Sequence, residues 1–189
     1  MTFGIHQFKN SKNSASYFVE RPFGNLLIFS DDLNDIDHEF IKSKGGLFRQ
    51  YFESFEGITS LNKKLFKIYG AKGIGNWIDE KFDPEIALER FNIDFNDPSL
   101  NFHIQGASKY IVLKQGSKKV ALLGSSFLLK ANGDILCLGH DHTESMLNKL
   151  KNDSVDLLYF TSFESQSSLV FKKLTVIEKI KKITGQLLE

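Results

Sequence analysis

Cysteine and proline are both scarce in this sequence, with one cysteine and three prolines among 189 residues. Because Cys137 has no second cysteine to pair with, a disulfide within the chain is excluded, which is typical of a reducing compartment. The low proline content argues against long disordered segments. Residues 1–14 contain no apolar run as long as a signal peptide or a membrane span requires. We therefore expect a cytoplasmic protein that does not enter a membrane.

An excess of charge of one sign is also missing, since 24 basic and 23 acidic side chains give a net charge of +1. Without an overall field, attraction to nucleic acid or to anionic lipid is not expected. The composition, 41% hydrophobic and 25% charged, is that of a globular protein. A chain of this length predicts one domain, 1–189, around one core. The 18 phenylalanines are best explained as large core side chains.

In the first half, short extended segments alternate with amphipathic helical segments. β-Branched and aromatic residues between turn formers predict strands at residues 17–20, 26–30 and 47–52, the first two joined as a hairpin. Helical spacing and capping residues predict helices at residues 34–44 and 58–69. The side chains expected on their buried faces are Ile36, Phe40 and Ile41 in the first helix, and Leu61, Leu65, Ile68 and Tyr69 in the second.

The second half is richer in predicted strands. They cover residues 102–104, 109–115, 119–129, 135–138 and 155–161, and helices are predicted at residues 143–151 and 174–187. The central strands are expected to bury Val120, Leu122, Leu157 and Tyr159. The glycine-rich segment 70–75 follows a predicted helix, whereas a nucleotide-binding loop follows a strand, so it is interpreted as a turn into an edge strand.

The order of these segments from residue 16 to residue 174 resembles that of the metallo-β-lactamase fold hydrolases. Four sequence segments carry the resemblance. They are residues 17–22 with 24–28, residues 44–47 with 51–52, residues 119–127, and the predicted helix and strand at 144–150 and 155–161. The resemblance implies an α/β (α+β) chain folded as a four-layer αββα sandwich, in which two mixed β-sheets are flanked by helices. The chain is short for this fold, which suggests trimmed loops and a reduced helical layer within residues 81–100.

The resemblance does not extend to the metal ligands of the family. Ser54 stands where the first ligand histidine belongs, Ser125 where the bridging aspartate belongs, and Ser162 follows the strand that precedes the closing histidine. The Pro-Gly-His-Thr signature expected after Phe102 is missing, and no histidine lies between His38 and His103. Serine hydroxyls are poor zinc ligands. We therefore expect no metal cofactor at the ancestral position, where only Glu56 still carries a carboxylate.

These losses predict a non-catalytic binding module with no cofactor. The pocket left by the ancestral site is expected to be lined by polar side chains, namely Ser54, Glu56, Ser125, Ser126, Thr161 and Ser162. Such a lining offers many hydrogen-bonding groups and one formal charge. The expected partner is a small neutral polar ligand or, alternatively, a protein.

A different metal site remains an alternative. Cys137, His140 and His142 are close in sequence, and Glu144 follows them. Their spacing permits metal binding, which would make the chain a hydrolase with an atypical centre. The same residues also fit a buried strand cysteine followed by exposed histidines at a helix N-terminus.

Two further possibilities concern the serines. The candidate nucleophiles are Ser54, Ser125 and Ser126, with His103 as their base, but no Gly-x-Ser-x-Gly elbow is present. A hydroxyl-lined pocket explains the same residues without catalysis. A purely structural subunit is the third class of function, and an exposed apolar patch at the former active-site mouth would favour it.

Overall fold

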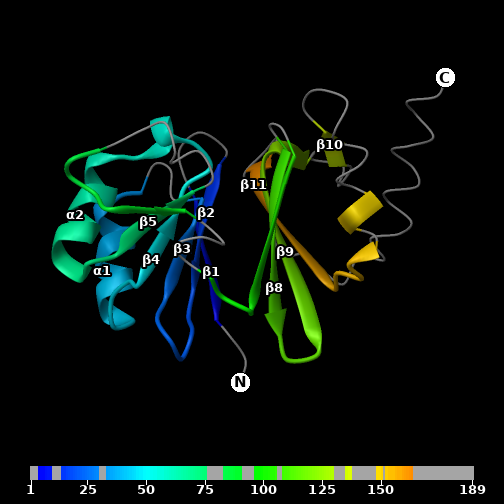
Figure 1. Ribbon diagram of the computed structural model, residues 1–189, viewed down its shortest axis with the longest axis horizontal. Helices are drawn as coiled ribbons and strands as arrows, with labels where there is room; N and C mark the ends of the chain where they lie inside the picture. The colour runs from blue at the N-terminus through cyan, green and yellow to red at the C-terminus, as the bar shows by residue number, and fades with distance from the viewer. Residues whose placement is uncertain are drawn as a thin grey trace. The chain divides into compact units, whose positions relative to one another are not determined.

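The computed structural model describes residues 4–9, 14–29, 33–75, 83–90, 96–105, 108–129, 135–137, 148–150 and 152–163. The chain divides into two compact units. The N-terminal unit is Phe3–Asp97, and the C-terminal unit is Pro98–Glu189 together with Met1–Thr2. Each unit is built on its own β-sheet (Figure 1). The predicted tail helix at residues 174–187 lies outside the described residues, as does the segment 138–147.

The N-terminal unit contains a six-stranded mixed sheet in the order β1-β2-β3-β4-β5-β6. Its strands are β1 (Ile5–Lys9), β2 (Ala15–Val19), β3 (Leu26–Ile28), β4 (Arg49–Tyr51), β5 (Lys72–Gly75) and β6 (Leu88–Arg90). The first three strands pair antiparallel, which confirms the predicted hairpin, and β3 to β6 pair parallel. Because β6 pairs with β5, the prediction that the glycine-rich segment leads into an edge strand is wrong.

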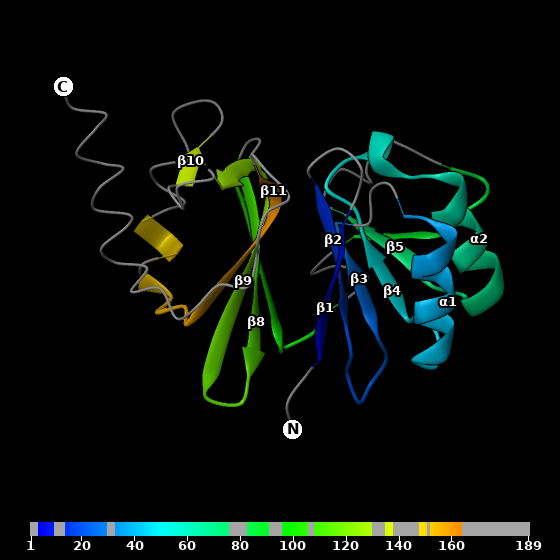
Figure 2. The same ribbon diagram turned by 180° about the vertical axis from the view of Figure 1, so that it is seen from behind.

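Both faces of this sheet are buried, as expected for parallel strands with hydrophobic side chains on each face. Both helices lie against one face (Figure 2). The core cluster on that face consists of Phe8, Phe18, Leu27, Ile41, Leu47, Leu65 and Ala71. Tyr17, Ile28 and Tyr51 are aligned across the strands on the other face and are also buried.

The helix α1 (Asp35–Ser43) begins and ends close to its predicted limits. The Asn34 side chain accepts hydrogen bonds from the backbone of Ile36 and Asp37, and Asp37 reciprocates in a capping box. Ile41 is buried, but Ile36 is 81% exposed, so its predicted core position is wrong. The reason is geometric, because five residues correspond to a rotation of about 140° around a helix.

The helix α2 (Ser60–Tyr69) has the predicted cap and stop signals. Thr59 and Asn62 form a capping box, and Gly70 ends the helix with a left-handed φ of 68°. Leu65 is completely buried, whereas Ile68 is 50% exposed, which corrects the prediction that it is a core residue. Ile68 is about 60° around the helix from Leu65 and about 120° from the buried Asn62, at the rim of the packed face.

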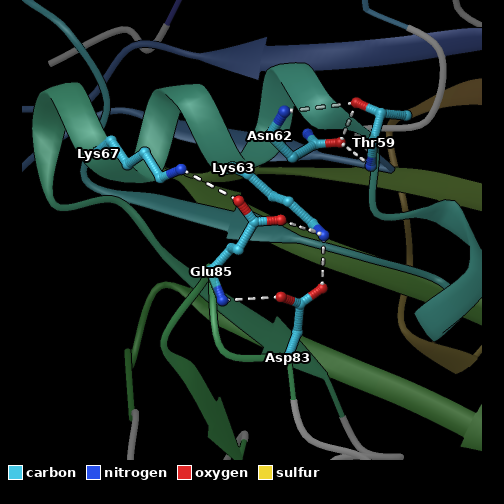
Figure 3. Close-up of polar contacts among 6 residues, drawn as sticks. All are labelled: Thr59, Asn62, Lys63, Lys67, Asp83 and Glu85. Carbon is cyan, nitrogen blue, oxygen red and sulfur yellow. Dashed lines mark hydrogen bonds and ion pairs between the residues drawn. The ribbon is translucent and has the colours of Figure 1, made fainter.

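An ion-pair network attaches the segment before β6 to α2 (Figure 3). The Lys63 Nζ atom lies 3.0 Å from Asp83 Oδ2 and 2.9 Å from Glu85 Oε2, and Lys67 Nζ lies 3.1 Å from Glu85 Oε1. The Glu85 backbone N–H donates to Asp83, and this bond, with Lys63, holds the pKa of Asp83 below its ordinary value. The network therefore holds the segment before β6 against α2.

The C-terminal unit contains a second mixed sheet in the order β10-β9-β8-β7, with β11 paired to β9. Its strands are β7 (Leu100–Gln105), β8 (Ser108–Gln115), β9 (Lys118–Leu129), β10 (Ile135–Cys137) and β11 (Leu157–Phe163). The β8–β9 hairpin is as predicted, and β11 runs parallel to β9. Of the helix predicted at residues 143–151, the described residues 148–150 are helical, as is Asn152.

The centre of this second sheet is buried on both faces, since consecutive residues of β8 and β9 are inaccessible. Val120 and Leu122 are buried as predicted, at 1% and 0% exposure. Leu157 and Tyr159 are half-buried, so they contribute to the core less than predicted. No helix in the described part of the chain is long and apolar enough to cross a membrane.

Candidate functional site

The pairing of β9 with its neighbours is interrupted at one place. β8 pairs with β9 up to Leu123, and β10 pairs with it from Phe127 onward. On the β11 side the register moves from Leu123, opposite Phe160, directly to Leu128, opposite Ser162. None of the three strand pairings therefore includes Gly124, Ser125 or Ser126. Interruptions of this kind re-aim side chains and are common beside functional sites.

Two hydroxyl groups at this break are buried without a hydrogen-bond partner. Ser126 is 6% exposed and Thr161 is 4% exposed. Within the described part of the chain, neither Ser126 Oγ nor Thr161 Oγ1 has a partner. A buried hydroxyl without a partner costs free energy, so native proteins rarely retain one without a reason. Ser126 Oγ and Thr161 Oγ1 therefore retain unused hydrogen-bonding capacity in the described structure.

Large apolar residues are the sequence neighbours of these two hydroxyl residues. Phe127 and Phe160, the residues that follow Ser126 and precede Thr161, are buried at 0% and 1% exposure. Ser125 is exposed, and Ser162 is half-buried. The break therefore combines two buried hydroxyls with two serines that are exposed or half-buried.

Ser54 and Glu56, the other two predicted pocket residues, lie in the N-terminal unit, between β4 and α2. Ser54 precedes the short 3₁₀ helix η1 (Phe55–Gly57), and its side chain does not cap that helix. Glu56 is exposed. The four remaining residues of the predicted pocket lie in the C-terminal unit, so the joint lining of one pocket by all six stays a prediction.

Buried amides fix the segment that carries Ser54. The Gln50 Nε2 atom donates to the backbone carbonyls of Asn62 and Ala71, at 3.0 and 2.9 Å, and Asn62 Nδ2 donates to Gln50 Oε1 at 3.0 Å. Both side chains have no exposed surface. The network ties the strand before η1 to the helix after it, a role that the apolar periodicity of the sequence did not reveal.

Two ionisable side chains lie at the C-terminal end of β4, namely Tyr51, its last residue, and Glu53, two residues later. Burial raises the pKa of the Tyr51 hydroxyl, and the negative charge of Glu53 raises it further. Tyr51 is 3% exposed and Glu53 8% exposed. The tyrosine is therefore neutral at physiological pH and is not an activated phenolate.

The side chains at the inferred ligand positions do not fit zinc. Ser54, Ser125 and Ser162 offer neutral hydroxyl oxygens, and Glu56 offers a single carboxylate. Among the described residues, no group of three or more His, Cys, Asp or Glu side chains is placed to hold a metal ion. The alternative metal site at His140 and His142 lies outside the described residues, as does the side chain of Cys137.

His103 is not placed as a base for a serine within the described structure. Its ring stacks on Tyr110 with ring centroids 4.4 Å apart, and its Nε2 atom lies 3.3 Å from Asp153 Oδ2. The proposed pairing of His103 with a nucleophilic serine is therefore not observed. The contact with Asp153 was missed from the sequence because the two residues are fifty positions apart.

Comparisons with known proteins agree with this architecture. No protein-family model matches the sequence, and no curated protein does. The structure is similar to that of an archaeal metallo-β-lactamase superfamily protein from Sulfolobus tokodaii, with a TM-score of 0.60 and 11% identity over 98% of this chain and 86% of that one. It also resembles a quorum-quenching N-acyl homoserine lactone lactonase, with a TM-score of 0.57 and 11% identity over 90% of this chain and 98% of that one.

A third solved structure, a putative metallo-β-lactamase from Thermotoga maritima, matches with a TM-score of 0.51 and 14% identity. The match covers 86% of this chain and 94% of that one. Likeness at such identities establishes the fold. The chain therefore has the metallo-β-lactamase fold, as its order of segments predicted.

Proposed function

We propose that this chain is a non-catalytic metallo-β-lactamase-fold protein that binds a small neutral polar molecule at the break in β9. The observation that carries the proposal is the pair of buried hydroxyls, Ser126 and Thr161, without partners. Each hydroxyl can donate one hydrogen bond and accept two. A ligand that satisfies both would recover the free energy lost by burying them.

The charge of the site favours a neutral ligand. The described residues at the break, from Gly124 to Ser126 with Thr161 and Ser162, carry no formal charge. A phosphate or a carboxylate would lose its hydration there without meeting a cation. Alcohols, amides and sugars match the hydroxyls without this penalty. The same absence of charge, with serines at the inferred ligand positions, argues against hydrolysis by a bound metal ion.

A thermal-shift screen tests the proposal with neutral polyols, sugars and primary amides, and with phosphate and acetate as charged comparators. A ligand at about 100 times its Kd stabilises the native state by about 2.7 kcal/mol. For a chain of this size that corresponds to an increase in Tm of roughly 5–10 °C. We expect neutral compounds to give such shifts and the anions to give none.

The variants Ser126→Ala and Thr161→Val separate binding from folding. Because the two hydroxyls have no partner, their removal should leave the Tm of the free protein unchanged or higher. The ligand-induced shift should disappear in both variants. Ser117→Ala, at an exposed serine in the β8–β9 turn of the same unit, is the matched control and should retain the full shift. A shift that persists in both hydroxyl variants would place the ligand elsewhere and refute the proposal.

A further inference from the structure

Three lysines gather at the turn that joins β8 to β9. The turn consists of Gly116 and Ser117 and lies at one end of the second sheet (Figure 1). Gly116 has a φ of 64°, the left-handed conformation that tight two-residue hairpin turns require. Lys114 and Lys119 are direct cross-strand partners, and Lys118 is the first residue of β9. The short turn therefore fixes lysines of both strands close to one another.

Lys114 and Lys119 are held in the closer of the two kinds of antiparallel pair. The Lys114 N–H donates to the Ser99 carbonyl at 2.9 Å, and the Lys119 N–H donates to Asp156 Oδ2 at 2.8 Å. Because neither N–H donates to the opposite lysine, the two lysines form a non-hydrogen-bonded pair, in which the Cα atoms are about 4.5 Å apart. Like charges directly opposite one another destabilise a hairpin. The free protein therefore carries a repulsion at this turn.

No carboxylate in the described part of the second unit forms an ion pair with these lysines. The Lys119 Nζ atom donates to the backbone carbonyl of Asp153 at 2.6 Å, which is a dipole and not a counter-charge. The Asp153 carboxylate instead accepts from the Tyr110 hydroxyl at 3.2 Å. Lys114 and Lys118 are exposed, and within the described ranges neither ammonium group has a charged partner. The end of the hairpin therefore retains positive charge that a partner could neutralise.

The chemistry of this surface favours carboxylates as the counter-charges. Its cations are lysines, whose ammonium groups act as point charges, whereas the planar fork of arginine suits bidentate recognition of phosphate. Gly116 and Ser117 offer neither an aromatic ring on which a base could stack nor an apolar side chain that could enter a bilayer. The net charge of +1 gives the chain no long-range attraction to a polyelectrolyte. An acidic protein segment therefore fits this surface better than nucleic acid or a membrane does.

We propose that the β8–β9 turn, with Lys114, Lys118 and Lys119, is a docking surface for an acidic segment of a partner protein. Carboxylates placed between Lys114 and Lys119 would replace the repulsion between them with attraction to both. The surface shares no residue with the break in β9, so the proposal does not depend on the proposed function.

A dye-labelled hexaglutamate peptide is the probe, and fluorescence anisotropy measures its binding. We expect binding at about 20 mM salt that weakens several-fold at about 200 mM, because salt screens exposed charges. A labelled oligothymidylate of the same length and vesicles that contain phosphatidylserine are the comparators. Both should bind more weakly than the peptide, and tighter binding of either one would overturn the choice of partner.

Lys114→Glu separates docking from folding. Its carboxylate would lie opposite Lys119 and attract it, so the variant should have a Tm equal to or above that of the unaltered protein. Its affinity for the peptide should fall by at least about fivefold, because one attraction is lost and one repulsion is added, and a single exposed ion pair contributes a factor of roughly 1.5–5.

Lys118→Gln removes one exposed charge and should lower the affinity by roughly 1.5- to 5-fold, the contribution of one exposed ion pair. Lys64→Gln, at an exposed lysine of α2 in the N-terminal unit, is the matched control and should bind the peptide as the unaltered protein does.

An unchanged affinity in Lys114→Glu would overturn the proposal. Equal losses in Lys64→Gln and Lys118→Gln would also overturn it, because the peptide would then be attracted to the lysines of the chain in general. Lys118→Gln keeps the test decisive if Lys114→Glu fails to fold, since the exposed Lys118 has no charged partner to lose within the described structure. In that case a loss of affinity supports the docking surface, and an unchanged affinity contradicts it.

Discussion

Leu122 lies in the middle of β9, with its side chain completely buried and its backbone paired with Ile111 and Tyr159. Truncation of such a side chain removes apolar contacts and leaves a cavity that the sheet cannot fill. We expect Leu122→Ala to reduce the free energy of unfolding by about 2–5 kcal/mol. Urea unfolding followed by circular dichroism measures this loss.

Ile68→Ala is the comparison for Leu122→Ala, because both remove an aliphatic side chain that the sequence placed in the core. Ile68 is half exposed, so its truncation should cost less than about 1 kcal/mol. Equal costs at the two positions would show that β9 is not a central strand.

At the scale of single residues, periodicity identified Leu122 and Leu65 but misplaced Ile36 and Ile68, because an apolar residue at the rim of a helix face has the same spacing as a buried one.

At the scale of elements, α2 depends on its first turn. The Thr59 Oγ1 atom accepts from the Asn62 backbone at 3.4 Å and donates to the Asn62 side chain at 2.6 Å, and that side chain also accepts from the Thr59 N–H (Figure 3). Thr59→Ala should therefore cost about 1 kcal/mol in the free energy of unfolding, the usual cost of a lost cap.

The control for this substitution is Thr59→Ser, which retains the hydroxyl and should lose less than about 0.5 kcal/mol. Thermal unfolding of both variants, followed at 222 nm, distinguishes them. Similar losses in the serine and alanine variants would assign the effect to the threonine methyl group and contradict a capping role.

Elements with strong local signals were predictable, and those that depend on distant pairing were not. The Asn34 and Thr59 caps and the turn between β8 and β9 are encoded within a few residues. The sequence therefore located α1, α2 and the β8–β9 hairpin correctly. The break in β9 depends instead on where β8, β10 and β11 stop pairing with it. The sequence named Ser126 and Thr161 through the resemblance, but it did not indicate that their hydroxyls are buried without partners.

At the scale of the whole molecule, the fold and the chemistry of this chain are supported by different evidence. The order of strands and helices matches solved structures of the metallo-β-lactamase fold at 11–14% identity, so the architecture tolerates replacement of most side chains. A zinc centre tolerates far less, because it needs imidazole and carboxylate ligands converging on one point. A fold can therefore persist after the residues that bind its metal have changed, and function has to be argued from the site.

The metal content of the purified protein follows from the side chains at the inferred ligand positions. Protein purified without chelators and without a polyhistidine tag should contain no stoichiometric zinc, iron or manganese by elemental analysis, because Ser54, Ser125 and Ser162 supply neither charge nor nitrogen ligands. The same protein should not turn over generic esters, phosphodiesters or β-lactams. A stoichiometric ion accompanied by turnover, both lost in His140→Ala and His142→Ala, would instead establish a hydrolase with its metal on the segment around those histidines. An ion retained in these variants but lost in Glu56→Gln would show that the ancestral position still binds metal through its one carboxylate.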